Sequence, residues 1–198
     1  MTSIAIANDK GGVGKTTVAA GLAAALRERG RFVSLIDLDP LGALGLLAIG
    51  VERVQPRDLP LALRRLSGSD YVVVDSPPGL RSHIDAAVAA CEGVLVPTTA
   101  HLLGLRGLSN LMASIDAEKV IGFVLTMSRP YTRHHQKVRA KIEQMGPPVL
   151  ASIPFTVSVS DAALYGKSLM DYGPSKRAGV SAAFNELAEA IERWKTRY

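Results

Sequence analysis

The sequence predicts an α/β fold, a single doubly wound and mostly parallel sheet with helices on both faces. Three observations predict it. Apolar runs alternate with helical patterns along the whole chain. The runs are β-branched and apolar on both faces, which is typical of strands in a parallel sheet that helices cover. No shift in composition marks a linker, so we expect residues 1–198 to form one domain with a sizeable core.

The expected strands are "SIAIAN", "FVSLID", "YVVVD", "GVLVPT", "VIGFVLT" and "VLASIP". The first ends at a glycine-rich loop, and "TTVAAGLAAALRER" after that loop is rich in alanine and leucine, with Gly30 as its C-cap. The segment 41–67 shows only the pattern of short helices and loop. The expected strands span 3–8, 32–37, 71–75, 93–98, 120–126 and 149–154. The expected helices span 16–29, 84–90, 105–115, 133–145 and 178–195.

Composition and charge limit the functional classes. The single cysteine, Cys91, excludes an internal disulfide and favours a reducing cytoplasm. We expect no signal peptide, because the N-terminus lacks a basic region followed by a long apolar run. We expect no membrane partner, and no run approaches the roughly 20 apolar residues of a membrane span. A net charge of +5 favours an anionic partner such as a nucleotide, DNA or a lipid surface.

The loop "NDKGGVGKTT" has the composition of a phosphate-binding loop, or P-loop. Its glycines let the backbone N–H groups point inward at phosphate oxygens, and the following helix adds the positive end of its dipole. Lys15 is expected to bridge the β- and γ-phosphates, Thr16 to bind Mg²⁺, and Thr17 to reach the α-phosphate. The expected nucleotide-binding residues of the loop are Gly11, Gly12, Val13, Gly14, Lys15, Thr16 and Thr17.

A second lysine, Lys10, gives the loop the deviant Walker A signature "KGGVGKT". With this motif the chain resembles the ParA/MinD family of P-loop ATPases, most closely the short, Soj-type ParA proteins of DNA partitioning. The resemblance implies ATP and Mg²⁺ as cofactors and a homodimer when ATP is bound. In that dimer Lys10 would reach the partner's ATP, which agrees with the need for cations where two triphosphates are buried face to face.

Carboxylates follow two of the expected strands. Asp37 and Asp39 in "LIDLDP" share one side by the two-residue period of a strand, at the edge where doubly wound folds bind ligands. The resemblance implies that Asp39 orients the attacking water and that Asp37 supports the metal site or the loop geometry. Asp75 ends "YVVVD", a segment similar to Walker B, and would hold Mg²⁺ through a water. Taken alone, Asp75 could equally cap the next helix. Leu41 stands where the family usually has glutamine.

Two later segments, "LTMSRP" and the stretch from 153 to 179, also resemble ParA sequences. By that resemblance Met127, Ser128, Pro154 and Phe155 would surround the adenine.

Basic residues are concentrated in "RPYTRHHQKVRAK" at 129–141, which has no acidic residue. Three of them are spaced four apart and form one stripe of a helix, the arrangement that binds phosphate backbones without reading sequence. An ordinary solvated helix face remains the alternative. Arg177 matches an arginine that some short ParA proteins use for DNA, whereas Ser158 stands where some relatives have another. The residues expected to bind DNA are Arg133, Lys137, Lys141, Lys176 and Arg177.

The resemblance implies a weak Mg²⁺-dependent ATPase that binds nonspecific DNA and segregates plasmid or chromosome DNA. A ParB-like centromere-binding or cargo-adaptor protein would stimulate it, and it would be cytoplasmic and nucleoid-associated. A related ATPase that positions a protein cargo or the division machinery is the alternative.

Three other classes fit the sequence less well. A MinD-like membrane ATPase would need an amphipathic anchor, but Trp194 falls on the apolar face of the last expected helix. The nitrogenase iron protein needs two cysteines per subunit for its cluster, and this chain has one. Cobyrinic acid synthases are expected to carry an additional substrate domain, for which no residues remain.

Overall fold

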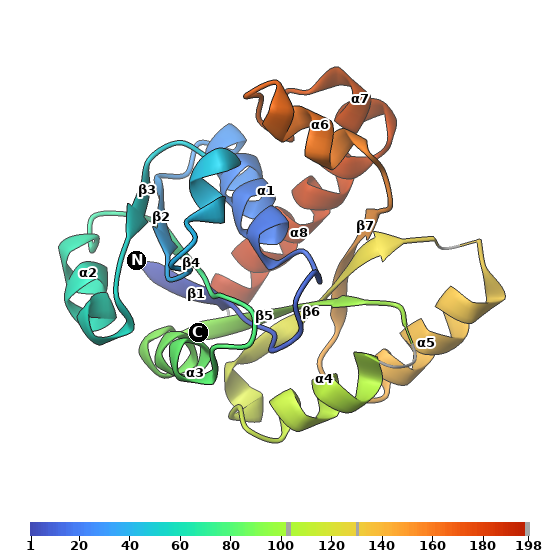
Figure 1. Ribbon diagram of the computed structural model, residues 1–198, viewed down its shortest axis with the longest axis horizontal. Helices are drawn as coiled ribbons and strands as arrows, with labels where there is room; N and C mark the ends of the chain where they lie inside the picture. The colour runs from blue at the N-terminus through green and yellow to red at the C-terminus, as the bar shows by residue number, and fades with distance from the viewer. Residues whose placement is uncertain (102–103, 130, 197–198) are drawn as a thin grey trace.

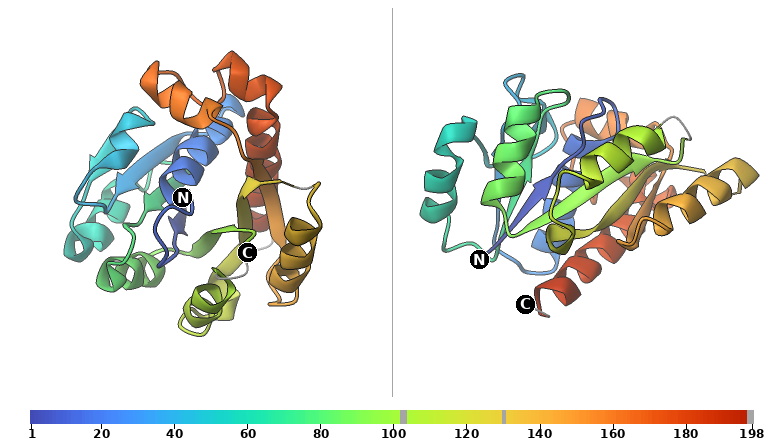
Figure 2. Two further views of the ribbon diagram at one scale, coloured as in Figure 1. Left: turned by 45° about the vertical axis from the view of Figure 1, so that its right-hand side comes forward. Right: turned by 90° about the horizontal axis from the view of Figure 1, so that it is seen from below.

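The computed structural model describes residues 1–101, 104–129 and 131–196. It contains a seven-stranded sheet in the order β3-β2-β4-β1-β5-β6-β7, and every pair of neighbouring strands is parallel. Helices cover both faces (Figures 1 and 2). The predicted fold class is confirmed. The strands are β1 (Thr2–Ile6), β2 (Val33–Asp37), β3 (Val51–Arg53), β4 (Tyr71–Asp75), β5 (Gly93–Thr99), β6 (Val120–Ser128) and β7 (Val149–Pro154).

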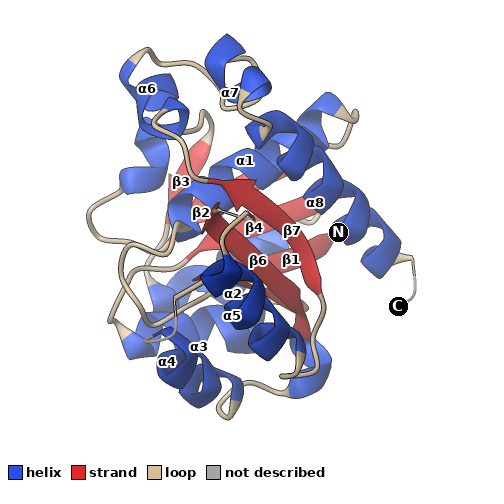
Figure 3. Ribbon diagram, turned by 90° about the vertical axis from the view of Figure 1, so that its right-hand side faces the viewer, coloured by secondary structure: helices blue, strands red, loops and turns tan. Residues whose placement is uncertain are grey.

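The helices form two layers, one against each face of the sheet (Figure 3). Short 3-10 segments lie at Ala43–Leu46, Pro56–Asp58 and Ala117–Lys119. The α-helices are α1 (Lys15–Glu28), α2 (Leu59–Arg65), α3 (Arg81–Ala90), α4 (Gly104–Met112), α5 (Arg133–Glu143), α6 (Ser158–Leu164), α7 (Gly173–Arg177) and α8 (Val180–Lys195).

Each face of the sheet has its own hydrophobic core, because successive side chains of a strand point to opposite faces. Ile4 and Ile6 of β1 pack with α1 and α8, whereas Ala5 packs in the cluster formed with α2, α3, α4 and α5. Strands buried on both faces read as continuous apolar runs, so the sequence revealed them readily.

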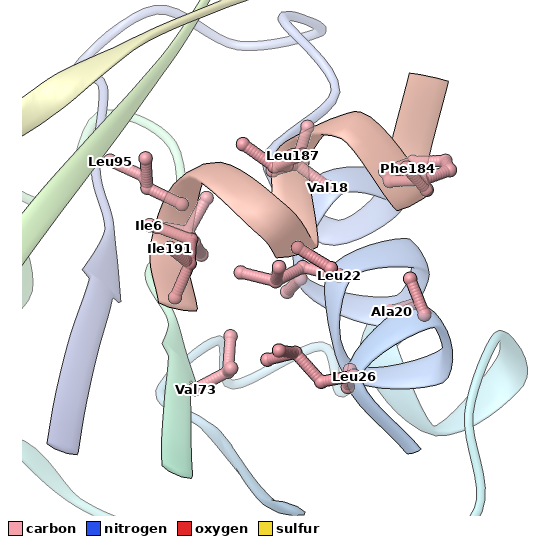
Figure 4. Packing of buried hydrophobic residues seen from close by; sticks show 14 of the residues in the cluster. Ile6, Val18, Ala20, Leu22, Leu26, Val73, Leu95, Phe184, Leu187 and Ile191 are labelled. Atoms are coloured by element: carbon pink, nitrogen blue, oxygen red, sulfur yellow. The ribbon is translucent and has the colours of Figure 1, made fainter. Parts of the chain in front are cut away.

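Helices α1 and α8 pack together over the first of these cores (Figure 4). A Cβ atom at Gly21 of α1 would lie 2.2 Å from the ring of Phe184, so the glycine lets the two helices approach closely. Near the end of α8, Trp194 packs against the same core, as the sequence predicted. A Cβ atom at Gly93 would lie 2.6 Å from its ring.

The structure adds elements that the sequence analysis did not specify. Strand β3 is only three residues long and half exposed, and α6 and α7 have seven and five residues. Elements this short show too little periodicity to be recognised. No helix in the described ranges is long and apolar enough to cross a membrane.

Candidate nucleotide and magnesium site

Three connections meet at the carboxyl end of the central strands. Strand β4 lies between β2 and β1, with Asp37 and Ile6 both in register with Asp75. The loop 7–14 that follows Ile6 therefore lies beside the two aspartates at the ends of the neighbouring strands. This edge is where parallel α/β sheets bind ligands.

The loop adopts the curled conformation that its glycines predict. Gly12 and Gly14 have φ angles of 71° and 83°, a region that L side chains rarely adopt. Lys15 curls back over the loop, and its Nζ atom donates to the carbonyl of Lys10 at 3.1 Å. The backbone N–H groups at the start of α1 and the Lys15 ammonium thus converge on one place, as binding of a polyphosphate requires.

Two side chains, Asn8 of the loop and Thr126 of β6, tie the loop to the neighbouring strands. The Asn8 amide donates to the carbonyl of Pro97 at 2.7 Å, and its Oδ1 accepts from the backbone N–H of Lys10 at 2.9 Å. The Thr126 hydroxyl donates to the carbonyl of Val13 at 2.8 Å. The loop is therefore fixed by β5 and β6 as well as by its own turn.

Lys15 and the carboxylates interact electrostatically. Burial lowers the pKa of Lys15, and the negative charges of Asp75, Asp39 and Asp9 oppose that shift. The ammonium is buried next to carboxylates, with the backbone carbonyl of Lys10 as its hydrogen-bond acceptor. Such a cation is well placed to exchange its carbonyl partner for phosphate oxygens.

Asp75 is buried, and neither of its carboxylate oxygens has a hydrogen-bond partner among the described residues. Burial raises the pKa of Asp75 to about 7, opposed by the Thr16 hydroxyl and Lys15. The Thr16 hydroxyl is close enough to lower the pKa, but it does not meet hydrogen-bond geometry. A buried, unpartnered carboxylate beside a threonine hydroxyl fits a hydrated Mg²⁺ ion, which takes oxygen ligands and keeps several waters.

Asp37 has its oxygens engaged by the backbone. One oxygen accepts from the N–H of Asp39 at 2.8 Å, and the other accepts from the N–H of Leu44 at 3.3 Å. Burial raises the pKa of Asp37, against these two hydrogen bonds. Of the two roles considered for Asp37, the geometry favours support of the loop; a metal contact stays a prediction.

Asp39 lies half-buried at the rim of the site. Its Oδ1 accepts from the N–H of Leu41, and its carbonyl accepts from the N–H of Gly42, both at 2.9 Å. Its charge acts on both Lys15 and Asp75. The carboxylate is thus near the ammonium and the candidate metal site, as a water-positioning group must be.

The first turn of α3 contributes two side chains that the sequence analysis missed. Arg81 pairs with Asp9 at 3.2 Å, and His83 Nδ1 lies 2.9 Å from the carbonyl of Leu38. Both contacts link α3 to a loop that lies far from it in the sequence. No local pattern signals them, because they depend on the order of the strands.

A pocket of about 220 Å³ opens beside the loop, between α1 and the ends of β6 and β7. Three residues predicted for the adenine line it, namely Met127, Pro154 and Phe155, together with Thr17. Its walls are largely apolar, as a base requires. Met127 has a φ angle of 51°, the single positive value among the described non-glycine residues.

Ser128 was also expected at the adenine, but it does not line this pocket, so a role for it there stays a prediction. Its side chain is buried, and its hydroxyl lies 3.2 Å from His135 Nε2.

The predicted basic residues are all exposed but lie in two places. Arg133, Lys137 and Lys141 follow one face of α5, whereas Lys176 and Arg177 end α7. These helices lie apart in Figures 1 and 3. Pro130 of the basic segment lies outside the described residues. Lys10 is exposed at the rim of the loop and its ammonium has no partner in the described ranges.

The geometry agrees with the comparisons with known proteins. Residues 4–169 match the model of the CobQ/CobB/MinD/ParA nucleotide-binding domain. The chain is 33% identical to the chromosome-partitioning ATPase Soj of Thermus thermophilus, covering 95% of this chain and 94% of Soj. It is 30% identical to the chromosome partitioning protein ParA of Caulobacter vibrioides (98% and 95%) and 32% identical to the maintenance of carboxysome distribution protein A of Gloeobacter kilaueensis (97% and 95%).

Solved structures show the same fold. The septum site-determining protein MinD of Pyrococcus horikoshii, complexed with Mg-ADP, matches with a TM-score of 0.77 at 24% identity, covering 98% of this chain and 97% of MinD. A cobyrinic acid a,c-diamide synthase of Mycobacterium smegmatis with ADP and magnesium matches with a TM-score of 0.74 at 26% identity, covering 100% and 96%. The match covers 96% of the synthase chain, so this synthase has no large additional domain. The lack of such a domain in the present chain therefore does not exclude the cobyrinic acid synthases.

Proposed function

Because the chain belongs to the CobQ/CobB/MinD/ParA nucleotide-binding family, we propose that it is a Mg²⁺-dependent ATPase that works as an ATP-bound homodimer on nonspecific DNA. ATP and Mg²⁺ are its cofactors, in keeping with the ADP, ATP-analogue and magnesium complexes of its structural relatives. The observation that carries the proposal is the loop with two lysines, one buried and one exposed. A subunit that binds its nucleotide alone needs only Lys15 for the phosphates, so the exposed Lys10 is left to act on the nucleotide of a second subunit.

In the proposed reaction Lys15 binds the β- and γ-phosphates, and the loop N–H groups hold them in place. Thr16 and, through a water, Asp75 would hold Mg²⁺, which would offset charge on the phosphates. Asp39 orients the water that attacks the γ-phosphate. Positioning and electrostatics provide most of the catalysis of phosphoryl transfer to water, so a general base is not required.

Dimer formation would link ATP to DNA binding. Lys10 of one subunit would reach the ATP of the other, so that the two sites close together. Each subunit brings the exposed α5 stripe and the Lys176–Arg177 pair of α7. Two subunits double the phosphate contacts, and the effective concentration of the second subunit multiplies the affinity. A ParB-like partner would then stimulate hydrolysis and release the dimer.

Binding to a nonspecific DNA fragment tests this function. Affinity is measured with ATP, with ADP and without nucleotide, at two salt concentrations, for the wild type and for Lys137→Glu. Binding that requires ATP, falls steeply with salt and weakens in Lys137→Glu is the expected result. A protein that binds ATP but no DNA under any condition would contradict it.

A second candidate is an ATPase that positions a protein cargo. It is favoured by the lengths of the alignments. The alignment with Soj spans 236 positions, so this chain of 198 residues aligns to Soj only with many gaps. The alignments with two carboxysome distribution proteins span 208 and 207 positions, close to the length of this chain. Both candidates use the same DNA-bound cycle. Purifying proteins that bind only the ATP state, followed by their identification as a DNA-binding or a cargo-bound protein, separates the two.

A further inference from the structure

The peptide that joins Leu38 to Asp39 is held at both of its polar ends. Its N–H, on Asp39, donates to Asp37 Oδ1 at 2.8 Å. Its carbonyl, on Leu38, lies 2.9 Å from His83 Nδ1. A carbonyl oxygen can only accept, so Nδ1 carries a proton and donates it. Because both ends are bonded, the plane of this peptide cannot rotate without breaking a hydrogen bond.

His83 is itself firmly anchored. It is the third residue of α3, and its backbone N–H donates to the carbonyl of Leu80 at 3.0 Å. The next residue, Ile84, is fully buried in the core formed with α2, α4 and α5. The imidazole is half-buried and reaches the connection after β2 from a rigid helix. It therefore transmits the position of α3 to the peptide next to Asp39.

We propose that His83 is a positioning residue for ATP hydrolysis, acting through the Leu38 carbonyl to aim the carboxylate of Asp39. This inference rests on the proposed function, in which Asp39 orients the attacking water. His83 touches neither nucleotide nor water in this role. Its contribution is to fix the direction of the Asp39 Cα–Cβ bond, because the rate of phosphoryl transfer depends on the placement of the attacking water to within about 1 Å.

The contact between His83 and Leu38 is not itself a proton-transfer contact. Nδ1 faces a backbone carbonyl, which neither gives nor takes a proton at neutral pH. Nδ1 carries a proton both in the neutral tautomer that the contact requires and in the imidazolium, so the hydrogen bond to Leu38 persists in either form. The effect of His83 on the rate should therefore be the same across the range from pH 6 to 8.

Three substitutions test the proposal in the full-length protein. His83→Ala removes the donor. His83→Asn keeps a nitrogen donor one bond beyond Cγ, at the place of Nδ1, whereas His83→Gln moves the donor one bond further out. Ser82→Ala changes the exposed neighbour on the same turn and serves as the matched control. Steady-state phosphate release gives kcat and KM for ATP, and thermal unfolding checks that each variant folds.

We expect kcat to fall about tenfold in His83→Ala and His83→Gln while KM for ATP changes less than about twofold, because only the transition state is affected. His83→Asn should recover most of kcat, and Ser82→Ala should match the wild type. A folded His83→Ala protein with unchanged kcat would overturn the proposal. So would His83→Asn as slow as His83→Ala, or a ratio of wild-type to variant kcat that changes with pH.

Asp39→Asn separates this inference from the proposed function. If Asp39→Asn hydrolyses ATP normally, the role of Asp39 fails, and the inference fails with it. If Asp39→Asn is inactive but His83→Ala has normal kcat, only the inference fails. The double variant should be no slower than Asp39→Asn alone, because two groups that act through the same water are not additive.

Discussion

The hydroxyl of Thr126, on β6, donates to the carbonyl of Val13 in the phosphate-binding loop at 2.8 Å, and the carbonyl of Thr98 lies 3.2 Å from the same oxygen. Strand β6 is separated from β1 by β5, so this contact joins the loop to a distant part of the sheet. A methyl carbon of Thr126 also lies 3.3 Å from the place of a Cβ atom on Gly14. These contacts within the protein therefore hold the loop in its curled form.

Thr126→Val should weaken nucleotide binding about fivefold, because one hydrogen bond to the loop is worth about 1 kcal/mol. Valine keeps the shape of threonine and removes only the hydroxyl. Titration with a fluorescent ATP analogue measures the dissociation constant. Thr126→Ser keeps the hydroxyl and should bind within about twofold of the wild type, so equal losses in both variants would contradict the argument.

Lys10→Ala should abolish ATP-dependent dimerisation and leave the affinity for ATP nearly unchanged, because the exposed Lys10 ammonium contacts nothing in the described part of its own subunit. Size-exclusion chromatography with light scattering, in the presence of a non-hydrolysable ATP analogue, measures the mass. Lys15→Ala is the contrasting variant and should lose nucleotide binding. A Lys10→Ala protein that still dimerises would show that this lysine does not act across the interface.

The sequence was sufficient to predict the P-loop and the carboxylates at strand ends because these features are local. Gly12 and Gly14 have the left-handed conformations that the motif requires, and Asp37 and Asp75 end adjacent strands in register. A local sequence pattern could not predict the contacts between the segments that follow different strands. The partner of His83 is a carbonyl 45 residues earlier, and it becomes a neighbour only through the order of the strands.

The same reasoning explains which elements of the fold were predicted. Buried parallel strands such as β4 are continuous apolar runs, and their predicted bounds agree with the structure. Strand β3 consists of "VER" at the sheet edge and shows neither an apolar run nor an alternation long enough to recognise. Likewise α6 and α7 are too short for a helical period to be recognised, although Ala162 of α6 packs into the core formed with α1 and α8.

Asp75→Asn should stabilise the nucleotide-free protein, and the gain should depend on pH. Burial raises the pKa of Asp75 to about 7, far above that of an aspartate in the unfolded chain, so the wild type loses stability as the group ionises in the unfolded state. The advantage of Asp75→Asn should be near zero at about pH 4, grow up to about pH 7 and then level off at about 4 kcal/mol. Urea unfolding at a series of pH values measures the free energy of unfolding.

Magnesium provides the control for that variant. Added Mg²⁺ and ATP should stabilise the wild type, because they bind the folded state, and should stabilise Asp75→Asn much less. An Asp75→Asn protein that is less stable than the wild type at pH 8 would show that the buried carboxylate is already satisfied. It would then not be a site awaiting a metal.

Gly21→Ala should destabilise the protein by about 1–3 kcal/mol, although alanine is the better helix former, because overpacking a dense core forces side chains or backbone to shift. The new Cβ atom would lie 2.2 Å from the ring of Phe184, which is fully buried and cannot swing into solvent. Gly107→Ala in α4 is the matched control: a Cβ atom there meets nothing within 4 Å, so only the helix propensity changes. Thermal unfolding should show a lower Tm for Gly21→Ala and an equal or higher Tm for Gly107→Ala. Equal Tm values in both variants would mean that α8 can move away from α1 at little cost.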